Sequence, residues 1–396
     1  MTHLHLAYFS PLPPEASGIS AYSQQLLKAL SQQASLTLFS PQPESVDPSL
    51  KQYGSIQALD RYPENRWRYD MALYQMGNSR YHQELYGMAL RYGGVVVLHD
   101  YGLHHFMYDY TAAEFGLYAR ELSYAVGAQG WQTAVRILSG ESIPPLYELP
   151  LNGRLLDSSL GVIVHSEYAR RLIQRERPDL PAATIPHLDL LEQRPSRSRR
   201  EQLGIDPAAP LFLTGGHITS AMQLEMALRA FAQVRQQMPT AHYLLAGGVQ
   251  PDVLVGELLA AYDLQNAVTL LGYVEDEQVF TEWIATADVV VNLRYPTIGE
   301  TSGIAMRALA AGRPLLVFDH GWYGELPDDV CLKVPVMDEA ALTGAMRRLA
   351  QERPLRERLG QAAVYYIQTH HQPAQVAAAY LTFIKQILNV IMGKLQ

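Results

Sequence analysis

The sequence NLRYPTIGETSGIAMRALAAGRP at residues 292–314 sets the architecture of the chain. It lies between ADVVVN at 287–292 and LLVF at 315–318, two short apolar segments typical of strands buried on both faces. Between them, apolar residues repeat at helical spacing: Ile304, Ala305, Ala308 and Leu309. Gly312 and Pro314 then end that pattern. The stretch therefore predicts a strand, a polar loop, a helix and a second strand.

The polar loop carries candidate binding residues at the helix start, namely Gly299, Glu300, Thr301, Ser302 and Gly303. Free backbone N–H groups and the positive end of a helix dipole suit a phosphate group. Glu300 could accept hydrogen bonds from sugar hydroxyls. A capped helix in a parallel sheet, without any ligand, would carry the same residues. Both interpretations stay open at this point.

Composition bounds the class of protein. The chain has 396 residues, enough for two domains, with 48% hydrophobic and 18% charged residues. Its net charge of -8 argues against a general nucleic-acid binder. Its one cysteine, Cys331, excludes an internal disulfide and a cysteine metal cluster. We expect no membrane span and no leader segment, and therefore a cytoplasmic protein.

Strand-like and helical segments alternate along the whole chain, which is typical of parallel sheets with right-handed crossovers. In the first half the predicted strands are residues 4–9, 36–39, 71–75, 95–98 and 161–164. In the second half they are residues 211–214, 243–246, 268–271, 289–291 and 315–318. The predicted fold class is α/β with two Rossmann-like, doubly wound domains.

Changes of pattern divide the chain. We predict an N-terminal domain at residues 1–190, with an aromatic, helical insertion at 101–158 that follows a strand end. A C-terminal domain is predicted at 204–374, and a last helix at 375–396 packs back toward the N-terminal domain. The polar stretch between the domains reads as a linker, and its arginines favour a solvated face over a lipid or polyanion contact. Those arginines are Arg194, Arg197, Arg199 and Arg200.

Four sequence motifs, in their order along the chain, resemble those of family 4 glycosyltransferases. They are PLPPEASGISAYS at 11–23, VVLHD at 96–100 followed by His104 and His105, VIVHSEYAR at 162–170, and GETSG at 299–303 followed by RALAAGRP at 307–314. The resemblance implies the GT-B fold, with two Rossmann-like domains facing across a cleft. The helical insertion resembles that of a bacterial subgroup of the family.

The resemblance also implies a reaction. A hexose would pass from a nucleotide-diphosphate sugar to a glycan, lipid-linked or small-molecule acceptor, with retention of configuration. The sugar nucleotide would bind mainly to the C-terminal domain and the acceptor to the N-terminal domain. No cofactor or metal ion is required if helix termini and cationic side chains neutralise the phosphates. The expected partners are the sugar nucleotide and the acceptor, with peripheral contact to the inner membrane face and no nucleic acid.

The predicted site residues fall into three groups. The catalytic residues are His99 and Glu300. The donor-binding residues are Gly18, Gly216, His217, Tyr273, Val274, Arg294, Thr301, Ser302, Gly303 and Arg307. The acceptor-binding residues are Asn78, Asp100 and His104. No metal site is predicted, because Asp100, His104 and His105 have no further ligand at a suitable spacing.

Three positions depart from the family pattern. His217 and Met222 stand where the family usually has cationic residues that bind the diphosphate, and Arg307 stands where it has a ribose-binding glutamate. One or two charge-assisted hydrogen bonds are then missing. The alternative function is therefore a non-catalytic GT-B protein that binds a sugar nucleotide or glycan, as a pseudoenzyme or a subunit of a complex. A GT-B epimerase or phosphorylase is less favoured, since their motifs are not found.

Overall fold

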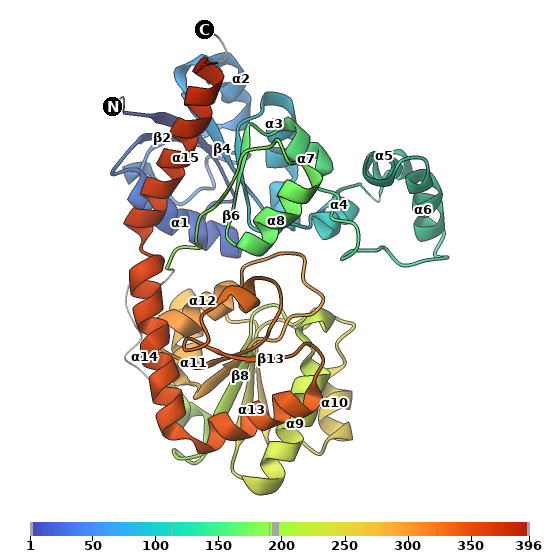
Figure 1. Cartoon of the computed structure of the whole chain (residues 1–396), viewed down its shortest axis with the longest axis vertical. Helices are drawn as coiled ribbons and strands as arrows, with labels where there is room; N and C mark the ends of the chain where they lie inside the picture. The colour runs from blue at the N-terminus through green and yellow to red at the C-terminus, as the bar shows by residue number, and fades with distance from the viewer. Residues whose placement is uncertain (1–2, 112, 190, 192–197, 394–396) are drawn as a thin grey trace. The chain divides into compact units, whose positions relative to one another are not determined.

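The computed structural model describes residues 3–111, 113–189, 191 and 198–393. It divides into two compact units (Figure 1). The first comprises Met1–Leu188, Ile298–Thr301 and Gln372–Gln396, and the second comprises Asp189–Thr297 and Ser302–His371. Arg194 and Arg197 of the predicted linker lie outside the described residues.

The first unit is built on a seven-stranded parallel sheet in the order β3-β2-β1-β4-β5-β6-β7. Its strands are β1 (His5–Phe9), β2 (Ser35–Ser40), β3 (Ser55–Ala58), β4 (Met71–Met76), β5 (Val95–Leu98), β6 (Gly161–Val164) and β7 (Ala182–Thr184). The central strands β4, β5 and β6 are buried along their whole length, which explains their continuous apolar sequences. The edge strand β3 was not predicted, because its partly exposed SIQA sequence has no apolar run.

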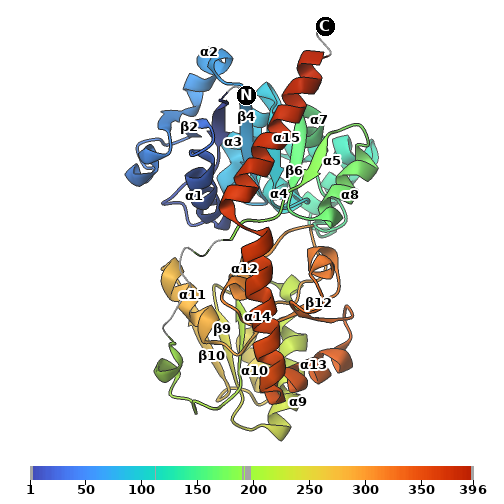
Figure 2. The same cartoon turned by 60° about the vertical axis from the view of Figure 1, so that its left-hand side comes forward.

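Helices lie on both faces of this sheet, and α5 and α6 stand out to one side of it (Figure 1). The helices of the first unit are α1 (Gly18–Leu30), α2 (Tyr62–Asn65), α3 (Gln83–Tyr92), α4 (His104–Thr111), α5 (Phe115–Val126), α6 (Gln129–Leu138), α7 (Gly153–Ser158), α8 (Glu167–Glu176) and α15 (Pro373–Gly393). The last helix, α15, packs along α1, and the hydroxyls of Tyr22 and Tyr380 lie 2.7 Å apart between them (Figure 2). This contact joins the two ends of the sequence into one unit.

By length and composition alone, α15 could cross a membrane, contrary to the expectation that no segment would qualify. Within its most apolar window, 39% of the residues are buried inside the unit. A core helix of this kind passes the same test, so the finding is weak evidence for a span.

The helical insertion contains α4, α5, α6 and α7, and within it α5 and α6 lie side by side (Figure 1). Gly130 of α6 makes their close approach possible. A Cβ atom at this position would lie 2.2 Å from the carbonyl carbon of Leu122 on α5. The insertion buries Tyr118 completely but leaves the Trp131 side chain 49% exposed.

Replacing Gly130 by alanine should separate α5 from α6, because the added methyl group meets backbone atoms that cannot rotate away. We expect the free energy of unfolding of the insertion to fall by about 2–3 kcal/mol. Limited proteolysis between the two helices and the fluorescence of Trp131 should report the opening. Gly116→Ala on α5 is the control, since its Cβ would meet nothing within 4 Å. Equal protease resistance in the two variants would contradict the prediction.

The second unit is built on a six-stranded parallel sheet in the order β10-β9-β8-β11-β12-β13. Its strands are β8 (Leu211–Gly215), β9 (His242–Ala246), β10 (Val268–Gly272), β11 (Val289–Val291), β12 (Leu315–Phe318) and β13 (Leu332–Val334). Its helices are α9 (Leu224–Gln237), α10 (Val255–Ala261), α11 (Glu277–Thr286), α12 (Gly303–Ala310), α13 (Glu339–Gln351) and α14 (Arg353–His370). The strand, loop, helix and strand predicted across residues 287–318 are confirmed as β11, α12 and β12.

Strand order shows where each sheet can bind a ligand. In the second unit, the chain fills one side of β8 with β9 and β10 and the other side with β11, β12 and β13. In the first unit the same change of direction falls between β1 and β4. Ligands of open α/β sheets bind outside the carboxyl ends of the strands at this switch point. The predicted α/β fold of two doubly wound domains is confirmed.

Candidate functional site

The switch point of the second unit lies between β8 and β11. The Thr214 hydroxyl ties the two strands by donating to the carbonyl oxygen of Val291 at 2.9 Å. Gly216 and His217 follow β8, and Asn292 follows β11. These residues therefore lie at the carboxyl ends of neighbouring strands, where a ligand is expected.

The loops after β8 and β9 pack backbone against backbone. Gly216 has φ +92° and donates its N–H to the carbonyl of Ala246 at 2.9 Å. Gly247 has φ +155°, and a Cβ atom there would lie 1.7 Å from the carbonyl oxygen of Gly216. Only glycine fits at Gly247, so the two loops can pack this closely only without a side chain there.

The start of α12 is held by two buried polar side chains. Ser302 is the N-cap, and its hydroxyl oxygen accepts from the N–H of Ala305 at 3.3 Å and from the Asn292 amide at 2.7 Å. The next two N–H groups, of Gly303 and Ile304, have no acceptor in the turn before them, because the helix starts there. A positively polarised helix end with two such amides can bind a phosphate group.

Two of the positions that depart from the family pattern have structural partners in the second unit. Arg307 is 7% exposed, and its guanidinium donates to the Glu277 carboxylate of α11 at 2.5 Å. Met222 is 2% exposed and packs in the hydrophobic core. The Glu277 side chain is 63% exposed, so a carboxylate does lie beside α12. The two residues are 30 positions apart, so no local sequence pattern indicates this pair.

The other predicted donor-binding residues are more scattered. His217 is exposed, and Arg294 after β11 is partly buried, as is Thr301 before α12. Tyr273 is 64% exposed, and it and Val274 follow β10, the edge strand of the sheet. In the first unit, Gly18 begins α1, and a Cβ atom there would meet nothing within 4 Å. The fold itself therefore does not require glycine at that position.

Glu300 clusters with the first unit, although the sequence division placed it in the C-terminal domain. Its side chain is buried, and one carboxylate oxygen accepts from the N–H of Ile298 at 2.9 Å. The carbonyl of Ile298 in turn accepts from the N–H of Gly102 at 2.8 Å. The short segment Ile298–Thr301 is therefore fixed against the residues that follow β5.

His99 lies in a buried cluster of aromatic rings. Its Nε2 is 2.8 Å from Oε1 of Gln75, and its Nδ1 is 3.2 Å from Nε2 of His165. Tyr22 packs edge-on against it, with ring centroids 4.7 Å apart. Burial, and then His165 and His187, hold the pKa of His99 well below its ordinary value. His99 is therefore neutral, and both of its ring nitrogens are already engaged, so the geometry favours packing over sugar contact.

The two adjacent histidines of the insertion differ. His104 is fully buried, with Nδ1 2.7 Å from the carbonyl of Leu149 and Nε2 2.8 Å from the Tyr118 hydroxyl. This geometry favours a structural role for His104 over its predicted role as an acceptor ligand. His105, which the prediction left out, is only partly buried.

Asn78 fixes the tautomer of His105. Its Oδ1 accepts from the backbone N–H of Phe106 at 2.8 Å, so its Nδ2 is the donor to His105 Nδ1 at 2.9 Å. Nε2 of His105 then carries the ring proton and can donate to a ligand. Asp100 orients Asn78 by accepting its backbone N–H at 2.8 Å. Asn78 and Asp100 thus position His105 and the start of α4.

Buried neutral histidines should make the chain sensitive to acid. Burial lowers the pKa of His82 to about 4 and that of His104 to about 4. Both values lie below the unfolded value of about 6.5, so the unfolded state binds more protons between those limits. Stability should therefore fall as the pH drops from about 6.5 toward 4, by about 1.4 kcal/mol per pH unit for each histidine.

Urea unfolding at pH 7, 6 and 5 measures this loss. His82→Asn should make the fall of stability with falling pH shallower by the contribution of one histidine. A free energy of unfolding that is the same at pH 7 and pH 5 would show that these rings titrate normally.

Comparison with known proteins identifies the second unit. The family model described as glycosyl transferases group 1 matches residues 209–352, which include β8 to β13 and the start of α12. The second unit is similar to a group 1 glycosyltransferase domain. The resemblance predicted from the sequence motifs is confirmed at the level of this glycosyltransferase family and its GT-B fold.

A curated relative of the chain is the alpha-D-kanosaminyltransferase of Streptomyces kanamyceticus. It is 25% identical over 216 residues, which are 51% of this chain. The match spans about half of the relative, 54% of its length.

Solved structures show the fold of the whole chain. Sucrose-phosphate synthase from Thermosynechococcus elongatus matches with a TM-score of 0.67 and 17% identity, over 98% of this chain and 100% of that one. HepE from Anabaena, in complex with UDP and glucose, matches with a TM-score of 0.65 and 14% identity, over 97% and 100% of the two chains. At these identities the likeness establishes the fold alone.

Within the described ranges, no group of three or more His, Cys, Asp or Glu side chains is arranged to hold a metal ion.

Proposed function

We propose that the chain is a glycosyltransferase that moves a hexose from a nucleotide-diphosphate sugar to a hydroxyl acceptor, with retention of configuration. The start of α12 carries this proposal. Ser302 and Asn292 hold the helix end at the switch point of the second unit, with the N–H groups of Gly303 and Ile304 left for a ligand. A diphosphate fits these donors, and they bind it without a metal ion.

The relatives support a sugar nucleotide as the ligand. HepE is seen in complexes with UDP and with UDP-glucose, and the curated relative is named for the transfer of a kanosaminyl group. Neither of them names the donor or the acceptor of this chain. One relative is thus seen with a nucleotide sugar and the other is named for transferring a glycosyl group, and the proposal combines these two features.

For the acceptor we propose the carboxyl edge of the first unit. There His105 offers an N–H donor at Nε2 and Glu300 offers a carboxylate. Burial lowers the pKa of His105, and the nearby carboxylates of Asp109 and then Glu300 oppose that lowering. A carboxylate and a neutral imidazole can together accept from and donate to sugar hydroxyls. With a glycan or lipid-linked acceptor, we also propose a cytoplasmic location with peripheral contact to the inner membrane face.

The test is incubation of the full chain with a panel of nucleotide sugars, with and without magnesium, and with simple glycosides as acceptors. Release of the nucleoside diphosphate from one donor, together with a product of unchanged anomeric configuration by NMR, is the expected result. A product of inverted configuration would refute retention. Release of the nucleoside diphosphate only in the presence of magnesium would refute diphosphate binding without a metal ion.

A non-catalytic sugar-nucleotide binder is the second candidate. The observation that favours it is the core position of Met222 and the ion pair of Arg307, since neither side chain supplies a charge to a diphosphate. It predicts tight binding of one nucleotide with no release of sugar from any donor in the panel. Turnover of even one donor would rule it out.

A further inference from the structure

A pocket in the second unit lies away from the switch point. It has a volume of about 430 Å³, and its polar lining includes Asp288, Arg313, Arg353, Arg356 and Glu357. Asp288 directly precedes β11 and Arg313 lies two residues before β12, so the pocket is at the amino ends of these strands. In a parallel sheet this edge is opposite to the one that holds the start of α12.

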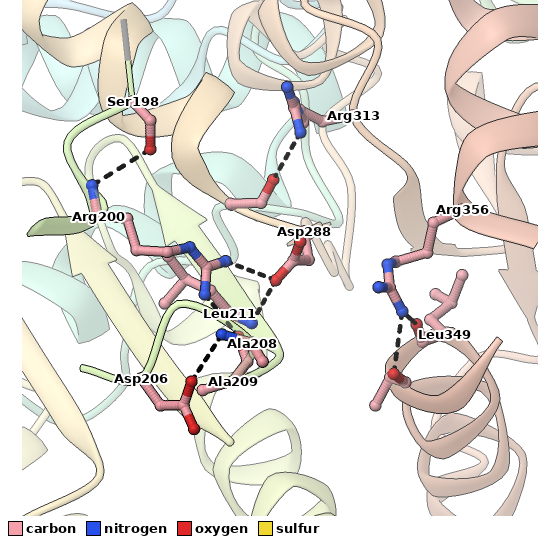
Figure 3. Close-up of polar contacts among 12 residues, drawn as sticks. Ser198, Arg200, Asp206, Ala208, Ala209, Leu211, Asp288, Arg313, Leu349 and Arg356 are labelled. Carbon is pink, nitrogen blue, oxygen red and sulfur yellow. Dashed lines mark hydrogen bonds and ion pairs between the residues drawn. The ribbon is translucent and has the colours of Figure 1, made fainter. Parts of the chain in front are cut away.

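The two carboxylates of the pocket already have cationic partners. Asp288 accepts from the Arg200 guanidinium at 2.7 Å and from the backbone N–H of Leu211 at 2.9 Å (Figure 3). Glu357 accepts from Nε of Arg353 at 2.8 Å. Three of the five charged lining residues are therefore balanced by ion pairs, and the other two are arginines.

The remaining arginines have only neutral acceptors among the residues that the structure describes. Arg356 donates to the carbonyls of Leu349 and Ala350 at 2.7 and 2.9 Å (Figure 3). Arg313 donates weakly to a backbone carbonyl at 3.4 Å, and its buried Nε has no acceptor. Burial lowers the pKa of Arg313, against the raising effect of the Asp288 carboxylate in the same pocket. A buried charged donor of this kind indicates that an acceptor belongs beside it.

Helix α14, of 18 residues, begins at Arg353, and its positively polarised end lies at the pocket together with the two arginines. Because α13 ends at Gln351, the last carbonyls of that helix lie there too, and Arg356 donates to two of them. Guanidinium groups prefer acceptors with several oxygens, and phosphate offers three. The volume is in the range of small-molecule sites.

We propose that this pocket binds a small phosphate-bearing molecule, with Arg313 and Arg356 as the phosphate ligands. The site is distinct from the proposed donor site, and it stands or falls independently of the transferase proposal. Its ligand would reach the amino edge of the sheet without contacting α12.

Titration calorimetry of the full chain with inorganic phosphate tests the proposal. Arg313→Gln should weaken phosphate binding at least tenfold. Arg358→Gln removes the same charge from an exposed position of α14 and should bind as the wild type does. Melting curves without phosphate should show that Arg313→Gln is folded, since this side chain has only one weak hydrogen bond to lose.

A third variant distinguishes phosphate binding at the pocket from phosphate binding at the start of α12. Gly303→Pro removes an amide at the start of α12 and should leave unchanged the share of phosphate binding that Arg313→Gln removes. If Gly303→Pro weakens the binding and Arg313→Gln does not, phosphate binds at the donor site and the pocket proposal is wrong. Failure of the wild type to bind millimolar phosphate would also overturn it.

Discussion

Gly247→Ala should unfold or severely destabilise the second unit, by about 3 kcal/mol or more. The added Cβ would lie 1.7 Å from the carbonyl oxygen of Gly216, which is backbone and cannot turn aside. The φ of +155° is in addition a conformation that alanine avoids. Relief would have to move the loop after β8 away from the loop after β9, and with it one wall of the candidate donor site.

The neighbouring glycine provides the control. A Cβ at Gly248 would come no closer than 3.7 Å to the nearest atom, the Nδ1 of His217. Gly248→Ala should therefore unfold in urea close to the wild type, while the midpoint of Gly247→Ala falls. Equal midpoints for the two variants would mean that the loops do not pack backbone against backbone as described.

Gly303→Pro should preserve the fold and weaken nucleotide binding. Gly303 is the first residue of α12, a position where proline is well tolerated because its missing N–H has no helical partner. The residue before it, Ser302, has φ -82° and ψ 115°, the extended conformation that a following proline requires. The substitution thus removes one proposed phosphate donor at little cost to the helix.

The expected loss is that of one charge-assisted hydrogen bond, about 1.5–3 kcal/mol, or roughly ten- to 150-fold in the dissociation constant. Gly303→Ala is the matched variant, because it adds a side chain but keeps the N–H. Calorimetric titration with the preferred nucleotide diphosphate measures both. If Gly303→Pro binds as tightly as Gly303→Ala, the amide of residue 303 does not contact the phosphate.

Much of the second unit could be predicted from local sequence. Strands β11 and β12 are buried on both faces, so they appear as short apolar runs, and the cap of α12 is formed by the serine directly before the helix. These features depend on neighbours in the chain. The edge strand β3 cannot be predicted in this way, because it is only partly buried and its sequence SIQA contains no continuous apolar run.

The site was predicted less well, because its contacts join distant parts of the chain. His104 and His105 are adjacent, and only Tyr118 and Leu149, 14 and 45 residues from His104, decide which ring is buried. Likewise, Glu277 of α11 pairs with Arg307 of α12, although the two are 30 residues apart. The pair brings a carboxylate to α12, where the sequence itself has an arginine. A motif gives the residue type at such a position, but the partner is set by the tertiary fold.

The most direct measurement is the thermal stability of the full chain against a panel of nucleoside diphosphates and their sugars. A ligand that binds only the folded state stabilises it by about 2.7 kcal/mol at a hundredfold excess over its dissociation constant. We expect one nucleotide to raise the melting temperature clearly, and Gly303→Pro to reduce that shift while Gly303→Ala retains it. If no nucleotide shifts the melting temperature at millimolar concentration, the start of α12 is a capped helix end and not a donor site.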